Sequence, residues 1–160
     1  MPKSSFPRPR ALATKLRFSI VASEFNPRYI DGLIRHAIKE LGSLAPNAAI
    51  SIHRVPGAFE IPILVRELAL QKKADAVIAI GVILKGKTDH AINLARSVTD
   101  ALQRIAMDFG VPTINVVLSL NSEAQARERC LGNKINRGTE AARAAVAIVD
   151  TISELRRAKS

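Results

Sequence analysis

The sequence predicts an α/β fold, a single three-layer α/β/α domain with a four-stranded parallel sheet. Short apolar runs alternate four times with helix-like stretches, and this alternation builds parallel sheets with helices on both faces. The run Ala76–Val82 is apolar throughout, as a strand covered on both sides must be. The length of 160 residues suits one domain, and 48% hydrophobic residues supply its core.

The first half of the chain contains two strands, each followed by a helix. Arg17–Ala22 is a short apolar strand, and Asn26-Pro27 then combines a capping residue with proline at the first helical position. Gly42 is expected to end the helix that follows. Ala49–Val55 alternates as a second strand, and Pro56-Gly57 breaks it. The second helix is marked by Ile61, Leu64, Val65, Leu68 and Ala69.

The second half begins with the third strand, Ala76–Val82. A long amphipathic helix is predicted over 89–109, ended by Gly110-Val111-Pro112. Thr113–Leu118 is the fourth strand. A short helix around 122–130 and a final helix over 137–157 complete the domain. Because parallel strands end at one edge of a sheet, the loops there should form the site. These loops are Phe25–Asn26, Val55–Glu60, Val82–His90 and Leu118–Ser122.

Charge and composition limit the kinds of partner that the protein is expected to bind. The net charge of +10 favours anionic partners, but aromatic residues are only 4% and the basic residues are scattered, so no nucleic-acid partner is expected. No apolar run has the length of a membrane span, so no membrane association is expected. The single Cys130 fits a reducing compartment, which predicts a cytoplasmic protein. Residues 1–15 are basic and rich in proline and are expected to form a flexible arm before the domain at 16–158.

The segment from Gly81 to His90 is the most informative one in the chain. A buried strand leads into Gly86-Lys87-Thr88, where free backbone N–H groups and a hydroxyl suit an anion. The alternative is a tight turn in which Thr88 only caps the helix. His90, in the first helical turn, is placed to transfer a proton, or else is a capping or buried histidine. His36 and His53 are interpreted as structural or surface residues.

Three other places carry candidate binding residues. Val55-Pro56-Gly57-Ala58-Phe59-Glu60-Ile61-Pro62 forms an irregular turn, and Glu60 either receives hydroxyl or ring N–H groups or caps a helix. Phe25 is either a packing residue or a platform under a flat ligand. Arg127, Arg129, Lys134 and Arg137 are either solvated charges or part of a phosphate subsite.

Taken together, these segments resemble the lumazine synthase family over about residues 17–152. The most specific pieces are Phe25-Asn26, the turn 55–62, Gly86-x-Thr88-x-His90 and Asn136-Arg137-Gly138-x-Glu140-Ala141-Ala142. The resemblance implies a flavodoxin-like sheet and the penultimate step of riboflavin biosynthesis. In that step 5-amino-6-(D-ribitylamino)uracil condenses with 3,4-dihydroxy-2-butanone 4-phosphate, giving 6,7-dimethyl-8-ribityllumazine, phosphate and water. It implies no cofactor and no metal.

The resemblance also assigns expected roles to individual residues. His90 would move protons. Phe25 would stack on the pyrimidine, and Lys87, Thr88 and Arg129 would hold the phosphate. The remaining expected substrate contacts are Ala58, Phe59 and Glu60 for the ribityl chain, Val82, Ile83 and Leu84 for the ring, and Asn115 for the pyrimidine pocket of a neighbouring subunit.

The family assembles as pentamers with sites at subunit borders, and in some members twelve pentamers form an icosahedral shell. A homopentamer is therefore expected, and the short Leu131–Asn136 segment is typical of shell-forming members. Riboflavin synthase is a candidate partner.

Several residues depart from the family pattern: Lys85 for arginine, Lys87 for a small residue, Ala91 for an aromatic residue, Asn115-Val116 for Phe-Gly, Cys130-Leu131 for Ala-Gly and Arg137 for lysine. Two alternatives stay open, of which Asn115 and Ala91 motivate the first. One is a lumazine- or flavin-binding protein of weak activity on the same fold, and the other is a monomeric flavodoxin-like FMN protein or regulator.

Overall fold

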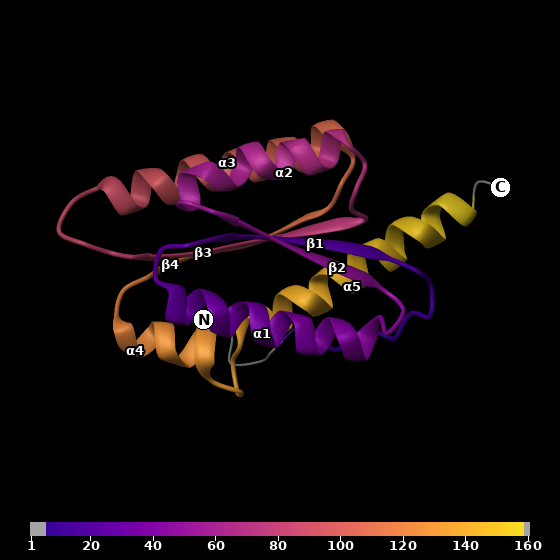
Figure 1. Ribbon diagram of the computed structural model, residues 1–160, viewed down its shortest axis with the longest axis horizontal. Coiled ribbons are helices and arrows are strands. Elements are labelled where there is room, and N and C mark those ends of the chain that lie inside the picture. The colour runs from indigo at the N-terminus through magenta and orange to yellow at the C-terminus, as the bar shows by residue number, and fades with distance from the viewer. Residues whose placement is uncertain (1–5, 159–160) are drawn as a thin grey trace.

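The computed structural model describes residues 6–158 and shows four strands, five α-helices and two short helical turns there (Figure 1). The strands are β1 (Arg17–Ser23), β2 (Ala49–Val55), β3 (Ala76–Leu84) and β4 (Thr113–Leu120). The helices are α1 (Pro27–Leu44), α2 (Ile61–Leu70), α3 (His90–Phe109), α4 (Glu123–Ala126) and α5 (Arg137–Arg157). A 3-10 turn (Ala58–Glu60) precedes α2, and a π-helical turn (Arg127–Leu131) follows α4.

The four strands form one parallel sheet in the order β2-β1-β3-β4, which confirms the predicted fold class. This is the flavodoxin-like order, in which the chain first adds a strand on one side of β1 and then crosses to the other side. Ala76 to Ile83 in β3 are all buried, because β3 lies between two strands and is covered by helices on both faces. The crossing point between β1 and β3 is where ligands bind in such sheets.

The helices cover the two faces unequally. Helices α2 and α3 lie together on one face, while α1, α5 and the short α4 lie on the other (Figure 1). Each face has its own apolar core cluster: Ile20, Ile78 and Ile80 point toward α1 and α5, and Val21, Val77 and Ala79 point toward α2 and α3. The period-two alternation of side chains along each strand produces this division.

Helices α1 and α5 approach each other closely because of Gly138. A Cβ atom there would overlap the carbonyl oxygen of Leu33 and lie 3.1 Å from its carbonyl carbon. Asn136 caps α5, since its Oδ1 accepts from the backbone N–H of Gly138 (2.8 Å) and of Thr139 (3.2 Å). The motif Asn136-Arg137-Gly138 thus both starts α5 and seats it on α1.

Some element ends differ from the sequence-based prediction. Gly42 does not end α1, which continues to Leu44, because Gly42 lacks the left-handed backbone of a helix-ending glycine and the last residue, Leu44, is buried in the core. Strand β3 runs to Leu84 and β4 to Leu120, because the two strands keep pairing as far as Leu84 and Leu120. The helix expected over 122–130 is α4 followed by the π-helical turn.

Residues 6–15 of the predicted arm pack against the domain. Leu12 is buried, and its N–H donates to the carbonyl of Leu44 (2.7 Å). Arg10 forms a bidentate pair with Asp150 of α5 at 2.8 and 2.9 Å. The predicted boundary at residue 15 therefore marks no break in packing, while residues 1–5 lie outside the described residues.

Between residues 6 and 158 no helix combines the length and the hydropathy that crossing a membrane would take.

Candidate functional site

A cavity of about 500 Å³ opens at the carboxyl edge of the sheet, at the crossing point between β1 and β3. It collects residues from the loop after β1, the turn after β2, the end of β3 and the start of α3. Its lining is Ser23, Phe25, Asn26, Gly57, Ala58, Phe59, Glu60, Val82, Ile83, Leu84, His90 and Leu94. Three of the four predicted loops therefore meet in one cavity.

The loop after β1 is held in an unusual conformation by Asn26. Its backbone is left-handed (φ 57°, ψ 55°), which asparagine tolerates better than most residues. Asn26 occupies the N-cap position of α1, as predicted, but its side chain makes no cap hydrogen bond. Its Nδ2 instead donates to the carbonyl of Val82 (2.8 Å), because the end of β3 lies within reach. This bond joins the loop after β1 to the end of β3.

Phe25 lies at the mouth of the cavity and is 69% exposed. Its backbone N–H donates to Oγ of the buried Ser23 (3.1 Å), which turns the chain at the strand end. An aromatic ring on a fixed backbone with most of its surface in water suits stacking on a flat ligand. The structure therefore agrees better with a platform than with a packing residue.

The turn after β2 brings a carboxylate close to that ring. A Cβ atom on Gly57 would lie 3.2 Å from Oε2 of Glu60 and 3.6 Å from the ring of Phe25. Glycine at position 57 therefore leaves room for both side chains over the turn. Glu60 is the N-cap residue of α2 but makes no side-chain cap hydrogen bond, so its carboxylate is directed elsewhere. Ala58 is buried beside it, and Phe59 is exposed.

The end of β3 and the first turn of α3 complete the cavity. Val82, Ile83 and Leu84 were expected to span a strand end and a loop, but all three belong to β3. His90 is the first residue of α3 and is exposed on the cavity side. Leu94 lies one turn later on the same helix face.

The loop between β3 and α3 contains the two residues expected to bind phosphate. Lys87 and Thr88 are exposed there, next to His90 but not in the cavity lining. The N-cap of α3 is Asp89 rather than Thr88, and the side chain of Asp89 makes no cap hydrogen bond. The Thr88 hydroxyl is thus not used as a helix cap.

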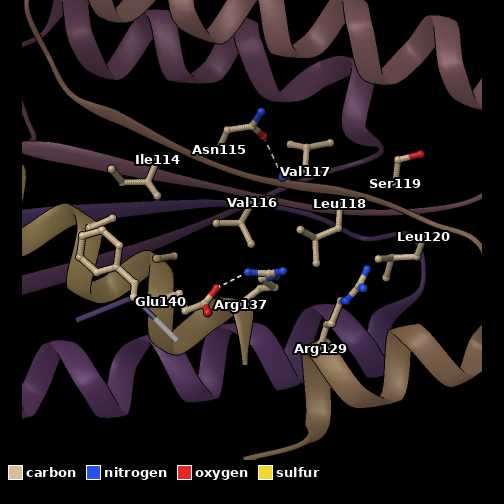
Figure 2. Close-up of a pocket in the computed structure, with 13 residues that line it drawn as sticks. Ile114, Asn115, Val116, Val117, Leu118, Ser119, Leu120, Arg129, Arg137 and Glu140 are labelled. Carbon is tan, nitrogen blue, oxygen red and sulfur yellow. Dashed lines mark hydrogen bonds and ion pairs between the residues drawn. The ribbon is translucent and has the colours of Figure 1, made fainter. Parts of the chain in front are cut away.

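Asn115 and Arg129 lie elsewhere, in a second cavity of about 550 Å³ along the free edge of β4 (Figure 2). Arg129, from the π-helical turn, lies beside the Leu120 end of β4, and Arg137 lies nearer Val116 and Leu118 (Figure 2). Arg137 pairs with Glu140 at 2.5 Å. The Asn115 side chain accepts from the N–H of Val117 (2.9 Å) and donates to Oγ1 of Thr99 (3.3 Å). One copy of the chain does not bring these two residues to His90.

Sequence reasoning missed four residues of the first cavity as site residues: Ser23, Asn26, Gly57 and Leu94. Leu94 could have been predicted from its spacing, because a residue four positions after His90 lies on the same helix face. For Asn26 and Gly57 the sequence predicts only backbone roles, a helix cap and a turn. The local sequence around Asn26 does not indicate that its side-chain amide reaches Val82.

The arrangement offers an aromatic platform, a carboxylate, strand-end backbone groups and an imidazole around one cavity. Such a site can orient a flat polar ring that carries hydroxyl groups, with a proton-transfer group beside it. Within residues 6–158 no group of three or more His, Cys, Asp or Glu side chains is placed to hold a metal ion.

Comparison with known proteins shows which family the chain belongs to. The family model described as 6,7-dimethyl-8-ribityllumazine synthase matches residues 15–153. Proteins of that name from Stenotrophomonas maltophilia (strain R551-3) and Halorhodospira halophila are 36% and 38% identical over 140 residues, 87% of this chain and 90% of each relative. The one from Leifsonia xyli is 41% identical over 145 residues, 89% of this chain and 90% of the relative. The chain belongs to the 6,7-dimethyl-8-ribityllumazine synthase family.

Proposed function

We propose that this protein condenses 5-amino-6-(D-ribitylamino)uracil with 3,4-dihydroxy-2-butanone 4-phosphate. The products are 6,7-dimethyl-8-ribityllumazine, phosphate and water, and the reaction is the penultimate step of riboflavin biosynthesis. The observation that carries the proposal is the convergence of eight predicted residues on one cavity. They are Phe25, Ala58, Phe59, Glu60, Val82, Ile83, Leu84 and His90.

The pyrimidine substrate fits the first cavity. Its flat ring stacks on the exposed Phe25, while backbone groups of Val82, Ile83 and Leu84 at the end of β3 meet its polar edge. The ribityl hydroxyls donate to the carboxylate of Glu60, beside Ala58 and Phe59. Charge-assisted bonds of this kind are stronger than neutral ones, so Glu60 contributes both affinity and orientation.

The chemistry needs no nucleophile from the enzyme. The primary amine of the pyrimidine attacks the ketone carbon, and loss of water gives an imine. A proton leaves the hydroxyl-bearing carbon as the carbon–oxygen bond to phosphate breaks, which releases phosphate and leaves an enol. The enol takes a proton at its terminal carbon and loses its hydroxyl proton to become a carbonyl. The ribityl-bearing nitrogen then attacks this carbonyl and closes the ring with loss of water. His90 accepts and returns protons in these steps. Holding two substrates together supplies much of the remaining acceleration.

The phosphate group is assigned to Lys87, Thr88 and Arg129. Lys87 and Thr88 lie in the loop next to His90, whereas Arg129 and Asn115 line the second cavity of the same chain. If all four contact one pair of substrates, Arg129 and Asn115 must come from an adjoining copy. We therefore propose a homo-oligomer with shared sites, a pentamer by family resemblance, alone or as twelve pentamers in a shell.

The same resemblance supports a cytoplasmic enzyme that needs no cofactor, with riboflavin synthase as a candidate partner. The residues around His90 support that scheme, because it asks the protein for acid–base transfer, anion binding and the positioning of two substrates.

The decisive experiment is to incubate the purified protein with both substrates and measure the lumazine chromophore together with released phosphate. Chromophore and phosphate should form in equal amounts. His90→Ala should lower kcat on the order of 10²-fold, the usual contribution of a proton-transfer group, while the product still binds. Unchanged kcat in that variant would reject the proton-transfer role.

The Arg129→Ala variant tests separately whether Arg129 contacts the phosphate group of the second substrate. It should raise KM for the phosphorylated substrate and leave KM for the pyrimidine nearly unchanged. A rise confined to the pyrimidine KM would contradict the assignment. Product binding by a wild-type protein that forms no chromophore would instead favour the lumazine- or flavin-binding alternative. A monomer that retains FMN would favour the FMN-protein alternative, so the mass of the native particle belongs in the same experiment.

A further inference from the structure

The arm is held to the domain by a cluster of ionic contacts around Glu40. The two carboxylate oxygens of Glu40 pair with Nε of Arg8 and with Nε of Arg143, each at 3.1 Å. Glu40 and Arg143 are 12% and 18% exposed, so solvent screens their pair less than a surface pair. Arg143 also donates from Nη1 to the backbone carbonyl of Phe6 (2.9 Å). Glu40 thereby orients the guanidinium that fixes the backbone at Phe6.

Three further contacts anchor the arm at Arg8 and at the residues that follow it. Arg8 donates to Oγ of Ser43 (2.5 Å), and Arg10 forms its bidentate pair with Asp150. Leu12 inserts into the core cluster shared with α1 and α5. A segment with this many partners has a defined path over the domain, so the position of Phe6 is set by the fold.

Phe6 lines the second cavity, along the free edge of β4, together with Asn115 and Arg129. It is the sole aromatic residue among the described residues that line this cavity. Its side chain is 41% exposed although its backbone is fixed, so the ring keeps a surface for another molecule. When a ligand covers a partly exposed apolar ring of this kind, the burial of apolar surface lowers the free energy of the complex.

The cavity has two chemically different ends. Arg129 lies beside Leu120 at one end, and Glu140 lies toward Ile114 at the other (Figure 2). Arg143, which holds Phe6, follows Glu140 along α5 and so lies further from Arg129. The ring therefore belongs to the end away from Arg129, which suits the flat part of a ligand rather than its phosphate.

We propose that Phe6 is a further substrate-contacting residue, which stacks on the pyrimidine ring and contributes to specificity for that substrate. This inference rests on the proposed function, because it requires the β4-edge cavity to form part of a site shared between copies. It assigns the arm a task in substrate binding through a residue that none of the sequence motifs contains.

The test compares Phe6→Ala and Phe6→Tyr with the wild type as intact, full-length oligomers. Stacking of a base on an aromatic side chain is typically strong enough that Phe6→Ala should raise KM for the pyrimidine about tenfold. It should weaken binding of 6,7-dimethyl-8-ribityllumazine by a similar factor, measured by fluorescence without turnover. KM for the phosphorylated substrate should stay within about twofold, and Phe6→Tyr should restore both values.

Met107→Ala is the matched control, because Met107 is an exposed apolar residue of α3 that lines neither cavity. Particle mass and thermal stability are measured for every variant, and Phe6→Leu replaces Phe6→Ala if the latter fails to assemble. If an active, assembled variant keeps the wild-type KM for the pyrimidine and the wild-type product affinity, the inference about Phe6 is overturned and the proposed function is not. A wild-type protein that forms no lumazine would instead overturn the proposed function.

Discussion

Replacing Gly138 by alanine should destabilise the protein, because α1 and α5 have no room for a methyl group between them. The new Cβ atom would overlap the carbonyl oxygen of Leu33 and lie 3.0 Å from Oδ1 of Asn136. The first of these atoms belongs to the backbone, and the second, at the end of the Asn136 side chain, is held by the cap bonds that start α5. The backbones of two packed helices would have to separate.

Overpacking of this kind costs about 1–3 kcal/mol, and a backbone obstacle favours the upper part of that range. Alanine recovers up to about 1 kcal/mol of helix propensity. The net loss should therefore be about 2 kcal/mol, or about 4–8 °C in Tm for a domain of this size.

Gly42→Ala is the matched control, since Gly42 lies in α1 with nothing within 4 Å of the new atom. It should stabilise the protein by about 0.5–1 kcal/mol. Thermal unfolding at one fixed protein concentration measures both variants, because Tm depends on concentration in an oligomer. Equal Tm shifts in the two variants would refute the packing argument.

Three further predictions follow from individual contacts. Asn26→Ala should lower stability by about 1–2 kcal/mol and weaken product binding, because alanine loses the bond to Val82 and is strained at a φ of 57°. Asn26→Gly also loses the bond but adopts this φ without strain, so it should lose less stability. Equal losses of stability in the two variants would contradict the role of φ. The hydrogen bond and charge of Arg10 lower the pKa of Asp150, so this contact stabilises the fold fully above the ordinary aspartate pKa of about 3.9 and is lost as pH falls through the lower folded value. Asp150→Asn should therefore have a lower Tm than the wild type at pH 7 and approach it near pH 3, and a difference independent of pH would count against the contact. Burial raises the pKa of the Cys130 thiol to about 11, so a thiol-specific reagent at pH 8 should label Cys130 only after unfolding; labelling of the folded protein within minutes would show that the site opens.

The sequence determined the order and type of the main elements, because each depends on local patterns. A strand buried on both faces must be apolar at every position, as Ala76–Val82 is. Apolar residues at helical spacing predict helices such as α3 and α5, since one side of each helix must face the sheet. The parallel order then follows from alternation, and with it the edge at which the site had to lie.

The tertiary structure decided how the chemistry-bearing side chains are grouped. The fourth predicted loop, Leu118–Ser122, follows β4, and its residues Leu118, Ser119 and Leu120 line the cavity along the free edge of β4. Asn115 and Arg129 line that same cavity and not the one that contains His90. The amide of Asn26 bonds to Val82, 56 positions away, instead of capping its own helix. Phe6 reaches its cavity through Arg143 on the last helix. These groupings depend on contacts between residues far apart in the chain, and local periodicity carries no information about them.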